Sequence, residues 1–218
     1  MRTGQVGYIQ HLDIAILYEI AKSAGGSIYA ARRPGSFVDA REPLVWATWQ
    51  PSKDEVTGIT SAFLIRPERS FKQDPRFGLI VLSEIASRAL SPGVNDPGTA
   101  IDVLGRVVRL LSSCPEHGGT ESKQAKFENV YVSAIEVSDI FDDVFTPIAR
   151  DGAGSVEVGI RLQKALTSLS RLAYEPYREN AARHSALALK RADAALALQE
   201  DREALAKVAA QGFAMQSD

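Results

Sequence analysis

Two neighbouring stretches of the chain carry apolar residues at the three- and four-residue spacing of amphipathic helices. The first stretch follows Asp74-Pro75 and the second follows Asp96-Pro97, so each opens with a capping acid and a proline suited to the first helical position. Because the connection between them is short, we predict antiparallel neighbours, a helical hairpin over residues 74–113. The predicted apolar stripes are Phe77, Val81 or Leu82, Ile85, Ala89 and Leu90 in the first helix, and Ile101, Leu104, Val107, Val108 and Leu111 in the second.

The linker of this hairpin has residues that end one helix and start the next. Pro92 disfavours helical geometry at Ser91, and Gly93 is predicted to take the left-handed conformation that closes a helix. Asp96 is predicted to cap the helix that follows.

Before the hairpin, short stretches rich in aromatic and β-branched residues predict strands. One helix interrupts them, from Leu12 or Asp13 to Gly25-Gly26. Gly58 to Ile65 is predicted as a strand, with the alternative that Asp54-Glu55 caps a short helix before it. We therefore predict a small β-rich, barrel-like lobe with one helix over residues 1–68. Its other strands are expected within 7–10, 27–32, 37–38 and 43–49.

Beyond the hairpin the pattern is mainly helical. Val130 to Ile135 is predicted as a strand or an extended connector. Helices are predicted from Ser138 or Asp139 to about Ile148, then up to about Tyr174, and then through an Ala-rich stretch that bends near residues 193–201. The predicted fold class is α+β, with the β-rich lobe followed by a helical bundle over residues 69–218.

Composition narrows the class of protein. The net charge of −2 gives no electrostatic reason to expect a nucleic-acid partner. Cys114 is the one cysteine, which rules out an internal disulfide and a cysteine-based zinc site. No apolar run approaches the ~18 residues that a transmembrane helix needs, so the sequence is expected to be water-soluble as it stands.

Several blocks of the sequence together resemble one known family. The longest is Ala89-Leu90-Ser91-Pro92-Gly93-Val94-Asn95-Asp96-Pro97, preceded by Glu68-Arg69-Ser70, Gln73-Asp74-Pro75 and Phe77-Gly78. Gly7-Tyr8-Ile9-Gln10 with Asp13, and Gly35-Ser36-Phe37-Val38, resemble earlier blocks of the same family. The family is that of bacterial predicted membrane proteins called domain of unknown function 2254, and the resemblance covers about residues 4–113 well.

The resemblance implies architecture and location and no chemistry. It implies an inner-membrane protein with transmembrane helices ahead of this portion, so we expect the sequence to be part of a longer protein. An even number of preceding spans would put this portion on the cytoplasmic face. The sequence departs from the family pattern at Gly98, where a bulky residue is usual, and at Ala40-Arg41, where a glycine is common.

Five residues form a candidate ligand- or anion-binding set: Arg69, Gln73, Asn95, Asp96 and Thr99. Helix N-termini offer free amides and partial positive charge to anions, which favours the Asn95-Asp96 turn as a site. The alternative is capping alone, because Asp96 would itself occupy those amides. Arg69 belongs to a modest basic cluster before the hairpin, for which acidic partners within the fold are the alternative explanation.

Asp139 and Asp143 are candidates for a divalent metal or a general acid/base pair, since i,i+4 spacing places both on one helix face. The alternative, which we favour, is a solvated, acid-rich helix N-terminus. His11, His117 and His184 have no ligand-like spacing, and no cofactor is expected.

The leading hypothesis is a non-catalytic domain with a structural, ligand-sensing or gating role for the membrane part of its own full-length protein, which is its expected partner. One rival is a metal-dependent hydrolase centred on Asn95-Asp96. Another is a homo-oligomerisation module, in which the Ala-rich helix packs between subunits.

Overall fold

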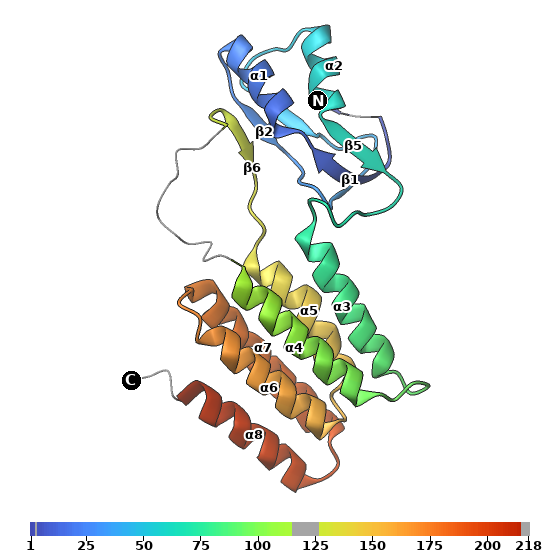
Figure 1. Cartoon of the computed structure of the whole chain (residues 1–218), viewed down its shortest axis with the longest axis vertical. Helices are drawn as coiled ribbons and strands as arrows, with labels where there is room; N and C mark the ends of the chain where they lie inside the picture. The colour runs from blue at the N-terminus through green and yellow to red at the C-terminus, as the bar shows by residue number, and fades with distance from the viewer. Residues whose placement is uncertain (3, 115–126, 215–218) are drawn as a thin grey trace. The chain divides into compact units, whose positions relative to one another are not determined.

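The computed structural model describes residues 1–2, 4–114 and 127–214 (Figure 1). The chain forms two compact units. The first unit holds residues 1–78 and the described residues that end at Ala134, and the second holds the remaining described residues, which begin at Leu79 and resume at Ile135. The fold is α+β, as predicted, with the strands in the first unit and most of the helical residues in the second.

The first unit contains two small sheets in place of one continuous one. In the first sheet, β1 (Gly7–Leu12) is central and pairs antiparallel with β3 (Phe37–Val38) and β5 (Phe63–Arg66). Gly7 and Ile9 of β1 are buried and Tyr8 and Gln10 are half-buried, which is the alternation of a strand with one face on a core. An irregularity in the pairing with β5 between Ile9 and His11 shifts this alternation by one residue, so that Leu12 is buried as well.

The second sheet brings together segments that lie far apart in sequence. Its central strand β2 (Ile28–Ala30) pairs antiparallel with β4 (Val45–Ala47) and parallel with β6 (Val130–Val132). The stretch predicted as strand or connector at residues 130–135 is thus a strand over its first three residues, and it belongs to the first unit.

Two helices complete the first unit, and one of them corrects a prediction. Helix α1 (Ile14–Ala24) is capped by Asp13 and ends at Gly25 in the left-handed conformation, as predicted. Helix α2 (Lys53–Ser61) occupies the start of the stretch that was predicted as strand from Gly58, so that prediction was wrong as far as Ser61 and right from Phe63, where β5 begins. The alternative of a short helix was right, although its N-cap is Ser52 and not Asp54-Glu55. The cause is a capping box: the Ser52 hydroxyl accepts from Glu55 N while the Glu55 carboxylate accepts from Ser52 N.

The second unit is a bundle whose apolar core is contributed by all the helices from α3 to α7. Helix α6 packs against α4, α7 and α8, and α5 packs against α7. Phe141, Phe145, Leu104, Leu166 and Leu169 are fully buried in this core. The bundle helices are α3 (Pro75–Ala89), α4 (Pro97–Ser113), α5 (Val137–Asp151), α6 (Val156–Ser170), α7 (Glu175–Ala195) and α8 (Gln199–Ala214).

The predicted hairpin is present as α3 and α4, which run antiparallel in Figure 1. Two details of the prediction were wrong. The left-handed residue of the linker is Asn95, with φ of 49°, and not Gly93. The apolar stripe of α3 also differs at Ile85, which is exposed, while Ser83 is buried and donates its hydroxyl hydrogen to Val144 O at 3.0 Å.

The Ala-rich stretch forms two helices separated by a short break between Ala195 and Gln199, which is a sharper interruption than the predicted bend. The small residues of α7 face the interior of the chain. Ala181 and Ala188 belong to the bundle core, and Ser185 is buried where its hydroxyl donates to Gln163 Oε1 at 2.6 Å. This face is therefore used within the chain.

Candidate functional site

A groove of about 380 Å³ lies at the junction of α3 and α4, within the second unit. Val81, Glu84, Ile85 and Arg88 line it from α3, at the spacing of one helix face. Val94 closes it from the linker, and Asp96 and Thr99 close it from the start of α4. The longest block that carries the family resemblance therefore forms one wall of a hollow.

Asp96 uses both carboxylate oxygens within its own turn. Oδ1 accepts from Thr99 N at 3.0 Å, and Oδ2 accepts from the Thr99 hydroxyl at 2.5 Å. These hydrogen bonds, with that from the Thr99 hydroxyl first, hold the pKa of Asp96 below its ordinary value. Asp96 is thus an ionised N-cap of α4, and the left-handed Asn95 lets the chain turn into that cap.

The apolar part of the groove is open to solvent. Ile85 is 44% exposed and Val94 is 55% exposed, while Glu84 and Arg88 place one charge of each sign beside them. An apolar surface of this kind suits a partner segment that carries both apolar and charged side chains.

The predicted stripe of α3 is right for Leu82, Ala89 and Leu90, which are buried or pack against the core. It is wrong for Ile85, which was expected in the core and faces the groove. The sequence did contain a signal for the buried face of α3. Leu79, Ser83 and Ala86 follow one another at helical spacing, have small or apolar side chains, and are buried.

Arg69 and Gln73, the other two residues of the predicted set, lie in the first unit and make contacts there. The Arg69 guanidinium pairs with the buried carboxylate of Asp74, with Nη2 and Oδ2 2.6 Å apart. Gln73 Oε1 accepts a hydrogen bond from Leu12 N at 2.9 Å. The acidic partner that was the alternative explanation for Arg69 is therefore Asp74, and both residues fasten the start of α3 to the first unit.

Asp139 and Asp143 lie on α5, with Asp139 in its first turn. Within the described residues 1–2, 4–114 and 127–214, no group of three or more His, Cys, Asp or Glu side chains is placed to hold a metal ion. The pair as a metal or acid/base site stays a prediction. His117 lies outside the described residues.

His184 is a buried titratable residue that sequence analysis set aside. Its ring packs against Phe141 and Phe145, and Nε2 lies 3.1 Å from Asp142 Oδ1. Burial, and secondarily the Arg183 charge, lower the pKa of His184 to about 4, and the Asp142 carboxylate offsets only part of this. The ring is therefore neutral at neutral pH.

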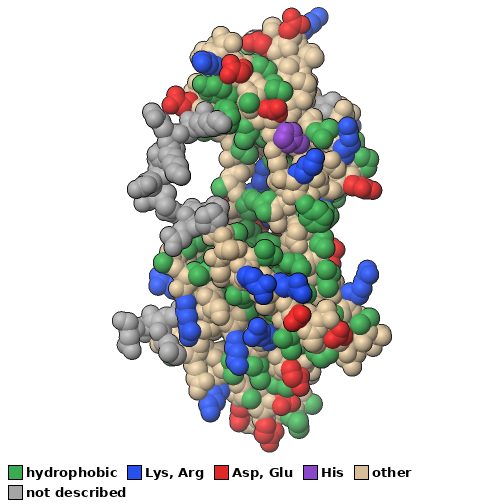
Figure 2. Space-filling model, viewed as in Figure 1, with side chains coloured by type: hydrophobic (Ala, Val, Ile, Leu, Met, Phe, Trp, Pro, Cys, Tyr) green, Lys and Arg blue, Asp and Glu red, His purple; other side chains and the backbone are tan. Residues whose placement is uncertain are grey.

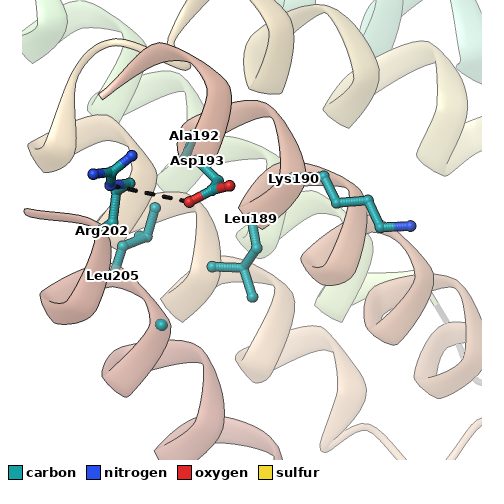
Figure 3. A pocket seen from close by; sticks show the side chains of 7 residues that line it. Leu189, Lys190, Ala192, Asp193, Arg202 and Leu205 are labelled. Carbon is teal, nitrogen blue, oxygen red and sulfur yellow. Dashed lines mark ion pairs between the residues drawn. The ribbon is translucent and has the colours of Figure 1, made fainter. Parts of the chain in front are cut away.

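A second hollow, of about 310 Å³, lies between α7 and α8 (Figure 3). Leu189 and the buried Leu205 form its apolar floor. Asp193 and Arg202 approach across it to 4.0 Å. This long ion pair joins the two helices beside the break.

The surface charge is mixed. Figure 2 shows side chains of both signs on the face in view, together with apolar side chains, in agreement with a net charge of −2. Among the helices that the structure describes, none combines the length and apolar character needed to cross a bilayer.

Comparison with known proteins identifies relatives but no activity. A family model described as "Predicted membrane protein (DUF2254)" matches residues 1–168. Over 116 residues the chain is 35% identical to the uncharacterized proteins Mb1321c of Mycobacterium bovis and Rv1290c of Mycobacterium tuberculosis, a match that covers 49% of this chain and 22% of each relative. The chain thus spans about a fifth of the length of the curated relatives it matches. No solved structure matches it.

Proposed function

The chain belongs to this family of predicted membrane proteins, and we propose that it is a non-catalytic domain outside the bilayer that docks onto the rest of its own protein through the α3–α4 groove. The role is structural or gating: the domain would hold or release the membrane part according to how this groove is occupied. Its proposed place is the cytoplasmic face of the inner membrane.

The observation that supports docking is the exposure of Ile85 and Val94 on a groove built by the linker block. Covering two such side chains would stabilise a complex by the hydrophobic effect, since burying a large aliphatic side chain contributes ~1.5–3 kcal/mol. The occupant we propose is a segment of the same protein, because most of the relatives' length lies outside the matched part.

The two rival functions have less support from the geometry. A metal-dependent hydrolase centred on Asn95-Asp96 would need Asp96 as a ligand or a base, yet both of its oxygens already accept hydrogen bonds from Thr99. Homo-oligomerisation through the Ala-rich helix would need the small-residue face of α7, which is buried within the chain. A self-association would therefore have to use another surface.

The test uses the full-length protein in native membranes, with Cys114→Ser and with any cysteine outside this sequence also replaced by serine. Val94→Cys is then joined to a short thiol-to-amine cross-linker, and the cross-linked peptides are identified by mass spectrometry. We expect links from residue 94 to a segment outside this chain. The matched control is Leu198→Cys, which is 60% exposed in the second unit but distant in sequence from the groove.

Three results would contradict the proposal. These are equal links from both cysteines, links only between copies of the protein, and no links from residue 94 outside this chain. In intact cells, labelling of Leu198→Cys, which is 60% exposed and outside the groove, by a membrane-impermeant maleimide only after lysis would support the cytoplasmic location.

A further inference from the structure

Three aromatic side chains form a row across the outer face of the β4-β2-β6 sheet. Tyr29 is the central residue, and it is in register with Trp46 on one side and with Tyr131 on the other. Their exposed fractions are 58% for Trp46, 44% for Tyr29 and 51% for Tyr131. Trp46, Tyr29 and Tyr131 are called the aromatic row below.

The row is not needed to fill the core of the first unit. The neighbours of Tyr29 in β2, Ile28 and Ala30, point inward and are buried, as is Val45 of β4. Because strand side chains alternate between faces, the row stands on the opposite face from that core. Large aromatic side chains that remain about half exposed in register mark a surface that contacts a partner.

The ring geometry restricts what the partner is. The Tyr29 and Tyr131 rings stack on each other, with centroids 4.7 Å apart and planes 12° apart. Their inner faces are therefore covered by each other, and a sugar or a nucleic-acid base cannot lie between them. Thr48 and Ser133, two residues beyond Trp46 and Tyr131, are exposed and uncharged, and the Arg33 guanidinium already donates a hydrogen bond to Ala134 O, next to Ser133. These positions are therefore not built like a phosphate-backbone site.

Trp and Tyr are the residues that gather where a protein meets the headgroup region of a bilayer, since each joins an apolar ring to a hydrogen-bonding group. The chain belongs to a family of predicted membrane proteins, and most of its relatives' length lies outside the matched part. We propose that the aromatic row is a membrane-contact surface that inserts into the interfacial region of a phospholipid bilayer. This inference rests on the proposed location beside a membrane but uses a different surface from the docking groove.

The experiment measures flotation of the chain with phospholipid vesicles of phosphatidylcholine alone and of phosphatidylcholine mixed with phosphatidylglycerol. The wild-type chain is expected to bind both, because aromatic insertion does not depend on anionic lipid. The double variant Trp46→Thr/Tyr131→Thr keeps β-branched residues in both strands and is expected to bind about tenfold more weakly.

The matched control is Phe37→Thr, which removes an aromatic residue that is 54% exposed on the other sheet of the same unit. It is expected to bind within about twofold of wild type. Thermal unfolding followed by circular dichroism checks that each variant is folded, and if the double variant is not, the single Trp46→Thr variant, expected to bind several-fold more weakly, takes its place.

The proposal is overturned if the wild-type chain floats with neither vesicle, if it binds only the anionic one, or if the folded row variant and Phe37→Thr bind equally. Binding of a single-stranded oligonucleotide or a polysaccharide that Trp46→Thr abolishes, without vesicle binding, would also overturn it. A negative flotation result would leave the cross-linking result at residue 94 unaffected. The membrane-contact proposal and the docking proposal can therefore be refuted independently.

Discussion

Each of the two units of this protein is stabilised by different structural features. The helical unit depends on side-chain volume, because large apolar residues such as Phe141 and Leu166 fill one continuous core. The β-rich unit has a smaller core, and every glycine with positive φ among the described residues lies in its turns and strands. An example is Gly35, where φ is +89° and an added Cβ would meet the Asp74 carboxylate. The two units should therefore be sensitive to different kinds of substitution.

The two tryptophans provide a way to follow the units separately. Trp46 and Trp49 both lie in the first unit, so tryptophan fluorescence reports on its unfolding. Far-ultraviolet circular dichroism reports mainly on the helices, most of which are in the second unit. Urea unfolding followed by both signals therefore distinguishes the units.

The largest expected effect is that of Phe141→Ala, which leaves a cavity where a fully buried ring contacts Phe145 and Tyr177. We expect the free energy of unfolding of the second unit to decrease by about 4 kcal/mol. The circular dichroism transition should move to lower urea, with the fluorescence transition nearly unchanged. Leu110→Ala, on the exposed side of α4, is the control, and an equal shift of both signals in Phe141→Ala would show that the units unfold together.

The next effect depends on pH and should appear in the second unit. The pKa of His184 is about 4 in the folded chain and near 6.5 when unfolded, so between these values the unfolded chain binds the extra proton. Stability is therefore full above about pH 6.5 and falls as the pH decreases towards 4, by roughly 3 kcal/mol in total. His184→Leu should remove this decline from the circular dichroism transition. An unchanged decline in that variant would assign it to other groups.

The smallest of the three effects tests the first unit. Gly35→Ala combines a left-handed backbone with a clash against Asp74, whose carboxylate is fixed by Arg69 and by Phe77 N. We expect a loss of about 2 kcal/mol from the fluorescence transition. Gly25→Ala is the control, because Gly25 has φ of +64° but no atom near an added Cβ. A loss no larger than that of Gly25→Ala would mean that crowding at Asp74 contributes nothing.

The sequence predicted well those elements that local signals define. The α3–α4 hairpin has an acid and a proline at the start of each helix, and its second apolar stripe is long. The end of helix α2 from Gly58 was predicted as strand because Ile59 and Thr60 are β-branched, and the helix alternative was given the cap Asp54-Glu55 where Ser52 with Glu55 forms it. The helix propensity of this stretch is weak, and the capping box at its start favours the helix.

The sites were harder to predict because they depend on register and rotation. The predicted α3 stripe included Leu82, Ala89 and Leu90 correctly, but it also placed Ile85 in the core although Ile85 lines the groove. The aromatic row could not be predicted, because it requires knowing that β6 pairs with β2 about a hundred positions earlier, in register. The predicted site residues also fall in different units: Arg69 and Gln73 lie in the first, and Asn95, Asp96 and Thr99 lie in the second. No local sequence pattern indicates this division.

The parallel pairing of β6 with β2 also bears on how the molecule is made. During synthesis, β2 leaves the ribosome before the α3–α4 hairpin and β6 leaves after it. The nascent first unit therefore lacks one edge strand until residue 132 has emerged. A truncated product that stops after α4 would leave β2 with an unpaired edge, open to strand addition by another chain. Completion of the N-terminal lobe is thereby tied to synthesis of the segment that follows α4.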